Sequence, residues 1–140
     1  MLGMCDLCHA IKNEPSRLIY QDDHVVVVLN FEPIKHGHVL IMPIRHAENL
    51  SDLTSAESSA FLKALDRCMK AVTKYSEEPP ISLIHGWKHR SQPHLHAHVL
   101  PSQHPIRGLF SVAEGTPRRL RLTDEVLKEM ADQIRPHHEE

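Results

Sequence analysis

The chain has 140 residues, of which 41% are hydrophobic and 24% charged, and its formal net charge is −2 at pH 7. This length predicts one globular domain with a single core. The apolar runs are far shorter than the roughly 20 residues of a membrane-spanning helix, and the first ten residues lack the features of a secretory signal. The small net charge argues against binding nucleic acid through bulk electrostatics.

Histidine and cysteine stand out in the composition, with 13 His and 3 Cys. An odd number of cysteines in a chain without a secretory signal does not fit a disulfide framework, and it favours a reducing, cytoplasmic location. Two of the cysteines form the motif Cys5-x-x-Cys8. These residues point to metal binding or catalysis.

The first predicted elements are three strands. Residues 18–29 favour two short strands on either side of a turn at residues 21–23. The β-branched run in the second of these is typical of a strand that is buried on both faces. Residues 37–43 favour a third strand, which the proline at its end would terminate.

The clearest predicted helix spans residues 51–75. Thr54 can cap its N-terminus, and Glu57 would complete a capping box. Apolar residues then recur at helical spacing. Cys68 falls on this apolar stripe, and we interpret it as a small buried residue.

The second half of the chain predicts two strands and a terminal helix. Residues 81–84 and 94–100 favour strands, and residues 124–134 favour a helix capped by Thr123. The tail, residues 136–140, is expected to be disordered. Strands, a long helix and further strands in this order predict an α+β fold with a mainly antiparallel sheet.

The strongest functional signal is the sequence His94-Leu95-His96-Ala97-His98-Val99-Leu100. Alternate side chains of a strand point to one face, so the three histidines would lie side by side while the residues between them face the core. Three adjacent imidazoles cannot all be charged cheaply, so most are expected to be neutral. Neutral imidazoles can attack phosphorus or hold a catalytic zinc, and the pattern alone leaves both open.

The same seven residues resemble the signature of the histidine triad (HIT) superfamily. Residues 29–33 and 37–43 resemble the family's upstream segment, and residues 45–53 resemble the segment that enters its long helix. The resemblance covers residues 5–104, so the chain is expected to be a single HIT domain with residues 105–140 as a C-terminal extension. It implies a mainly antiparallel five-stranded sheet with one long helix and a C-terminal helix.

The resemblance implies a nucleotidyl hydrolase or transferase with a nucleotidyl-histidine intermediate. His96, the middle histidine, would attack the α-phosphorus of a nucleotide. His98 and His38 would contact the phosphate oxygens. Asn30 matches the family position that hydrogen-bonds the ribose, which is often Asp.

The resemblance also implies zinc, of the kind found in the zinc-containing bacterial-type HIT branch. Its ligands would be Cys5, Cys8, His46 and His94. Two Cys and two His complete a tetrahedron, so this zinc would be structural. As a ligand, His94 would have a fixed ring that supports His96. A catalytic zinc on the three triad histidines is disfavoured, because it would leave the cysteines unused.

Just before the triad the chain departs from the hydrolase pattern. Many HIT hydrolases have Gln four residues before the first histidine, where this chain has Arg90. Residues 91–94 instead resemble the uridylyltransferase and dinucleoside polyphosphate phosphorylase branches, which replace the third histidine with Gln. His98 is the hydrolase-type residue. Ser91 and Gln92 are candidate substrate-binding residues.

These features predict a hydrolase of nucleoside phosphoanhydrides or phosphoramidates, of the dinucleoside polyphosphate or AMP-conjugate type. One alternative is a nucleotidyltransferase or phosphorylase, and another is a nucleotide-binding interaction module whose hydrolysis is incidental. The resemblance also predicts a homodimer, for which the long helix is a candidate interface. No membrane partner is expected.

Overall fold

The computed structural model describes residues 5–85 and 92–138, and residues 1–4, 86–91 and 139–140 lie outside the described part. The chain divides into two compact units, Met1–Gln103 and His104–Glu140. The candidate site belongs to the first unit.

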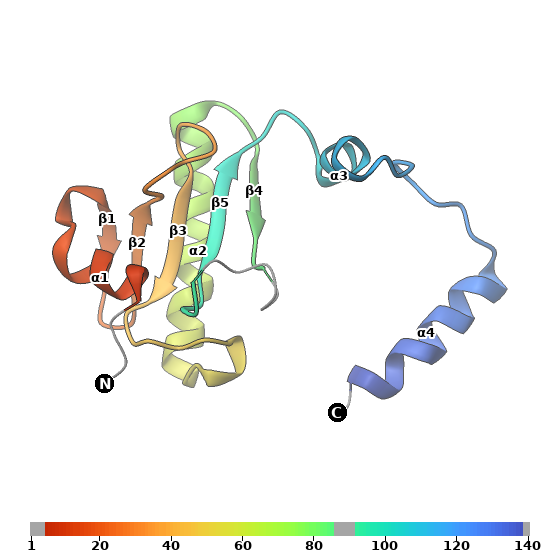
Figure 1. The fold of residues 1–140 in the computed structure, drawn as a ribbon, viewed down its shortest axis with the longest axis horizontal. Coiled ribbons are helices and arrows are strands. Elements are labelled where there is room, and N and C mark those ends of the chain that lie inside the picture. The colour runs from red at the N-terminus through yellow and green to blue at the C-terminus, as the bar shows by residue number, and fades with distance from the viewer. Residues whose placement is uncertain (1–4, 86–91, 139–140) are drawn as a thin grey trace. The chain divides into compact units, whose positions relative to one another are not determined.

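The first unit is built on one antiparallel sheet in the strand order β1-β2-β3-β5-β4 (Figure 1). The strands are β1 Leu18–Gln21, β2 Val25–Leu29, β3 Val39–Pro43, β4 Pro80–Leu83 and β5 Ala97–Pro101. Among the described residues of this unit, two α-helices and two 3₁₀ helices accompany them: α1 Asp6–Asn13, η1 Pro15–Arg17, η2 Leu50–Asp52 and α2 Ser55–Ser76. The predicted α+β fold, with five antiparallel strands and one long helix, is confirmed.

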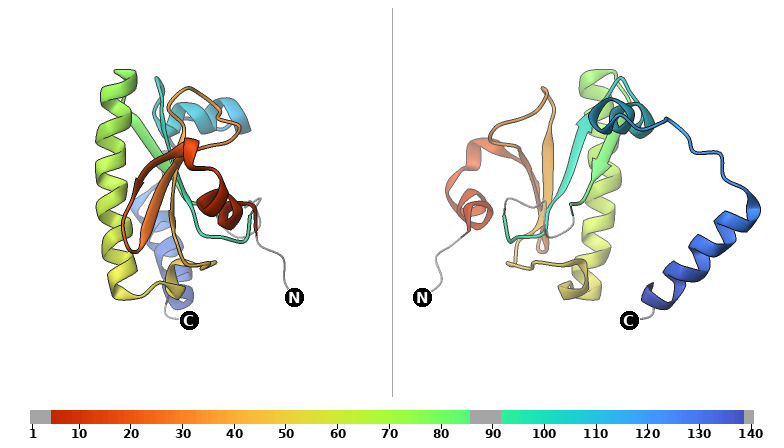
Figure 2. Two further views of the ribbon diagram at one scale, coloured as in Figure 1. Left: turned by 90° about the vertical axis from the view of Figure 1, so that its left-hand side faces the viewer. Right: turned by 45° about the vertical axis from the view of Figure 1, so that its right-hand side comes forward.

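Helices cover both faces of the sheet, α2 on one side and the shorter α1 on the other (Figure 2). The valines of β2 show the two layers. Val25 and Val27 pack in the cluster that includes Phe61 of α2, whereas Val26 and Val28 pack in a second cluster with Leu7 of α1. The prediction of a strand buried on both faces is therefore confirmed.

The long helix begins at Ser55, four residues later than predicted, after the separate helix η2. Its capping box is confirmed. The Thr54 hydroxyl oxygen accepts from the Glu57 N–H at 3.1 Å, and the Glu57 carboxylate accepts from the Thr54 N–H at 2.9 Å. Cys68 is buried as expected, and burial raises the pKa of its thiol to about 11, so this cysteine is inert as a nucleophile.

The triad strand is shorter than predicted, because β5 begins at Ala97 and leaves His94 and His96 before it. The ladder between β3 and β5 ends at the pair Ile41 and Ala97. Two residues further along β3 stands Pro43, which has no N–H to donate, and its carbonyl accepts from the His94 ring at 2.7 Å. The side chains of this segment still alternate between the two faces of the sheet as predicted, since Leu95, Ala97 and Val99 are buried in the cluster with α2.

The second unit contains two helices, α3 Ile106–Glu114 and α4 Asp124–His138. The sequence predicted no element at α3. The Thr123 hydroxyl accepts from the Val126 N–H at 3.3 Å, which confirms the predicted N-cap of α4. This helix continues through Pro136 to His138, beyond the predicted end at residue 134, so the expected disorder is wrong for residues 136–138. Ion pairs of Asp132 with Lys128 and Arg135 stabilise its last turns. Within the described residues, no helix has the length and apolar character to cross a membrane.

Candidate functional site

The rings of three histidines surround that of His98. His98 lies on β5, and the centroid of its ring is 5.1 Å from those of His96 and His38 and 4.9 Å from that of His85. His38 precedes β3, which pairs with β5, and His85 follows β4, whose Leu83 pairs with His98. His85 could not be identified from the sequence, since an isolated histidine after a strand carries no local signal. Only the β4–β5 register places it here.

Hydrogen bonds fix which ring nitrogen of His38 and of His98 carries the proton. The backbone N–H of Ile34 donates to His38 Nδ1 at 3.1 Å, so the proton of neutral His38 is on Nε2. His38 Nε2 lies 2.8 Å from His98 Nδ1, which must then accept. The proton of neutral His98 is therefore on Nε2. This chain of bonds presents His98 as a hydrogen-bond donor.

His96 carries its proton on the opposite nitrogen. His96 Nδ1 lies 2.7 Å from the carbonyl oxygen of His94, which can only accept. The Nδ1 atom therefore holds the proton, and the lone pair is on Nε2. A neutral imidazole with one nitrogen anchored in this way offers the other as a nucleophile.

His98 and His38 are held neutral. Burial and, to a smaller extent, the neighbouring rings of His96, His38 and His85 together lower the pKa of His98 to about 4. Burial likewise lowers the pKa of His38. Near pH 7 both side chains are uncharged, in agreement with the expectation that adjacent imidazoles are mostly neutral.

A cavity of about 430 Å³ opens beside these rings. It is lined by residues of α1, η1, the segment after β2 and the triad: Asp6, Leu7, His9, Glu14, Arg17, Asn30, Phe31, Glu32, Leu40, Gln92, His96 and His98. Four of the predicted site residues, Asn30, Gln92, His96 and His98, therefore share one cavity. Among the described residues His38 is not part of its wall, and its buried ring reaches the site through His98.

Two predicted substrate-binding residues have specific partners, and one lies outside the described part of the chain. The Asn30 side-chain oxygen accepts from the Glu32 N–H at 3.0 Å, and its amide nitrogen lies 3.4 Å from His38 Nε2. Gln92 and Asp6 bond reciprocally: the Gln92 amide donates to the Asp6 carboxylate at 2.9 Å, and the Asp6 N–H donates to the Gln92 amide oxygen at 3.3 Å. Ser91 is outside the described residues.

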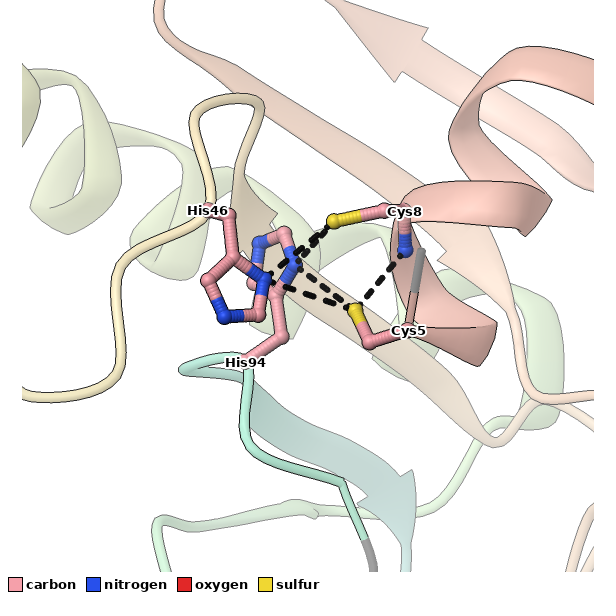
Figure 3. A group of neighbouring side chains, drawn as sticks. All are labelled: Cys5, Cys8, His46 and His94. Atoms are coloured by element: carbon pink, nitrogen blue, oxygen red, sulfur yellow. Dashed lines mark hydrogen bonds between the residues drawn. The ribbon is translucent and has the colours of Figure 1, made fainter. Parts of the chain in front are cut away.

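The four predicted metal ligands come together at one point (Figure 3). Cys5 and Cys8 come from the start of α1, His46 from the segment after β3 and His94 from the segment before β5. The sulfur atoms lie 3.3–3.6 Å from the Nδ1 atoms of the two histidines. Zinc–sulfur and zinc–nitrogen bonds of about 2.3 and 2.05 Å at tetrahedral angles would separate sulfur from nitrogen by about 3.6 Å. The cluster therefore matches the dimensions of a tetrahedral metal site.

The protonation of these groups also suits a cation. His94 Nε2 donates to the Pro43 carbonyl, so the lone pair of His94 is on Nδ1, the atom that faces the sulfurs. Burial and the adjacent Cys5 raise the pKa of the Cys8 thiol to about 11. Two neighbouring thiolates would be costly without a positive charge between them, and a bound cation supplies it.

Comparisons with known proteins show which family the chain belongs to. Residues 12–105 match the HIT domain family. An uncharacterised HIT-like protein of Methanocaldococcus jannaschii is 28% identical over 91% of this chain and 98% of its own length. A bis(5′-adenosyl)-triphosphatase of Saccharomyces cerevisiae is 34% identical over 61% of this chain and 43% of its own length.

A solved structure shows a similar fold. It is a zinc-bound histidine triad family protein from Mycobacterium smegmatis, with a TM-score of 0.63 and 22% identity over 73% of this chain and 77% of that one. The HIT domain match covers about two thirds of the present chain, including the triad and the strands that hold it. The chain therefore belongs to the HIT domain family.

Proposed function

We propose that this protein is a nucleotidyl hydrolase that acts on nucleoside phosphoanhydrides or phosphoramidates, with His96 as its nucleophile. The observation that carries the proposal is the hydrogen bond from His96 Nδ1 to the His94 carbonyl, because it puts the proton on Nδ1 and the lone pair on Nε2 of a histidine that lines the cavity. The likeness to a bis(5′-adenosyl)-triphosphatase supports a substrate of the dinucleoside polyphosphate or AMP-conjugate type.

The proposed reaction has two displacements at the α-phosphorus. In the first, His96 Nε2 forms a bond to phosphorus while the bond to the leaving oxygen or nitrogen breaks, and the leaving group takes up a proton from solvent. In the second, the oxygen of water forms a bond to phosphorus while the bond from phosphorus to Nε2 breaks, water gives up a proton to solvent, and the nucleoside monophosphate is released. Each displacement concentrates charge on the non-bridging oxygens, and His98 Nε2–H is the donor that stabilises it.

The remaining site residues bind the substrate or position a group that does. Asn30 contributes its amide to the ribose. His38 is a positioning residue, since it orients His98 through the bond of 2.8 Å. Gln92 and Ser91 stay predicted contacts of the phosphates; Gln92 would have to share its amide with Asp6.

We further propose that Cys5, Cys8, His46 and His94 bind a structural zinc ion. The sulfur–nitrogen distances and the protonation of His94 support this, as does the zinc in the Mycobacterium smegmatis protein. A bound zinc would supply a fixed cross-link between α1 and the segments around β3 and β5. The His94 backbone carbonyl, which orients His96, is then held by the same cross-link.

Product analysis tests the proposed activity. The substrates are an adenosine phosphoramidate, a diadenosine polyphosphate and adenylyl sulfate, each with and without added phosphate. We expect the wild type to release AMP without phosphate, and His96→Asn to lose turnover on every substrate. A requirement for phosphate would favour the phosphorylase alternative. Nucleotide binding without turnover would favour the interaction module.

The homodimer stays a prediction, which light scattering of the whole chain tests. The cytoplasmic location also stays a prediction.

A further inference from the structure

The cavity wall away from the triad contains a partly buried arginine. Arg17 is the last residue of η1, and its side chain is only 15% exposed. Its Nε atom is buried and has no hydrogen-bond partner among the residues that the structure describes. A ligand cannot reach this enclosed atom, but Arg17 lines the cavity, and its terminal guanidinium nitrogens are donors that a ligand there can meet.

The groups around Arg17 suit an aromatic, hydrogen-bonding ligand. The guanidinium carbon lies 5.6 Å from the centre of the Phe31 ring, which is 69% exposed. A terminal nitrogen of Arg17 lies 3.6 Å from the carboxylate of Glu14. All three residues line the same cavity as His96 and His98. This part of the wall therefore combines a flat ring, fixed donors and an acceptor.

We propose that Arg17 recognises the nucleobase of the substrate and that it favours guanine over adenine. This inference rests on the proposed function, which places the phosphates at His96 and His98 and so directs the base to the other part of the cavity. Phe31 provides a surface on which a base can stack. Among the bases, guanine offers two adjacent acceptors, O6 and N7, that match the paired donors of a guanidinium.

Adenine does not match this set of donors as well. It replaces O6 with an amino group, so a guanidinium that spans the same edge would meet a donor with a donor. Glu14 adds to the difference, because guanine has an N1–H and an amino group that a carboxylate can accept, whereas the N1 of adenine is itself an acceptor. Loss of a hydrogen bond to a charged group corresponds to roughly 10- to 150-fold in affinity.

Calorimetric binding of GMP and AMP to the full chain tests this proposal independently of turnover. The variant is Arg17→Met, which keeps an apolar side chain of similar length over Phe31 but has no donors. Arg67→Met, an exposed arginine on α2, is the matched control. We expect the wild type and the control to bind GMP at least tenfold more tightly than AMP, and Arg17→Met to reduce that ratio to about one.

Other outcomes overturn the proposal. These are a preference for AMP, a ratio that Arg17→Met leaves unchanged, and an equal loss of affinity for both nucleotides, which would make Arg17 a phosphate contact. Thermal unfolding of each variant shows whether the fold is retained, and Arg17→Lys, which keeps the charge without the planar fork, is the second variant. His96→Asn separates this proposal from the proposed function, because it should abolish turnover and retain the preference for GMP.

Discussion

Replacing His38 with phenylalanine isolates its effect on His98, because His38 is not part of the cavity wall. Phenylalanine retains the ring and most of the packing, so little cavity volume is created. Two hydrogen bonds disappear: the one of 3.1 Å that His38 accepts from the Ile34 N–H, and the one of 2.8 Å that it donates to His98. His98 Nδ1 is then left without its donor, and the proton of His98 is no longer directed to Nε2.

The magnitude follows from these two bonds. A buried group that loses its partner costs about 1–3 kcal/mol. Ile34 is itself exposed, so its N–H can find water, and we expect the free energy of unfolding to fall by about 2 kcal/mol. His98 would present its donor in only part of the molecules. Because the oxygen charge that it stabilises develops in the transition state, kcat should fall in proportion to the fraction of molecules that keep the donor, about 3- to 10-fold, with little change in KM.

Steady-state kinetics on an adenosine phosphoramidate measure the loss in kcat, and nitrogen NMR of the histidine rings measures which ring nitrogen of His98 carries the proton. The NMR spectrum should show His98 protonated on Nε2 in the wild type and a mixture in His38→Phe. His38→Gln can offer an amide N–H close to the position of Nε2 and should recover most of the activity. The reasoning is refuted if His38→Phe stays within twofold of the wild type in kcat, or if wild-type His98 carries its proton on Nδ1.

Three further predictions concern zinc and pH. Cys8→Ser should lose the stoichiometric zinc measured by elemental analysis, and its Tm should fall by about 10 °C or more. The control Cys68→Ala should keep its zinc. A wild-type protein that holds no zinc and keeps its Tm in chelator would contradict the structural site. The Arg45 guanidinium lowers the pKa of Glu57 to about 2, so the stability that Glu57 contributes is complete above pH 4.5 and is lost as the pH falls toward 2. Urea unfolding of Glu57→Gln should lack this part of the acid dependence, and an unchanged profile would count against the pairing. The pKa of His98 is lowered from 6.5 to about 4 in the folded protein, so the unfolded chain binds more protons between these two pH values. The free energy of unfolding of the wild type should therefore rise with pH across that window, and it should rise less in His98→Asn.

The elements that could be predicted from the sequence are those whose causes are local. The valines of β2 alternate between two apolar clusters because a strand alternates its side chains, and the run of four β-branched residues indicates this directly. The capping box of Thr54 and Glu57 spans only four residues, so the start of α2 is encoded where it occurs. The triad signature identifies His96 and His98 in the same way, and the HIT resemblance connects them with Asn30.

The features that could not be predicted depend on tertiary contacts. The late start of β5 follows from Pro43, a residue of another strand that is 51 positions from His94 in the sequence. Helix α1 is only eight residues long, and its position depends on Leu7 in the core and on the cysteines at its start. His85 and Arg17 lie in unremarkable sequence, and only the sheet register and the cavity show what they contact.

The central claim is that Nε2 of His96 attacks phosphorus, and the most direct test is to trap the intermediate. The full-length protein is mixed with an adenosine phosphoramidate, quenched within the first turnover without acid, digested and analysed by mass spectrometry. We predict one adenylyl group on the peptide that contains His96, fragmentation that assigns it to that residue, and no adduct in His96→Asn. An adenylyl group on another residue, or full turnover by His96→Asn, would contradict the mechanism.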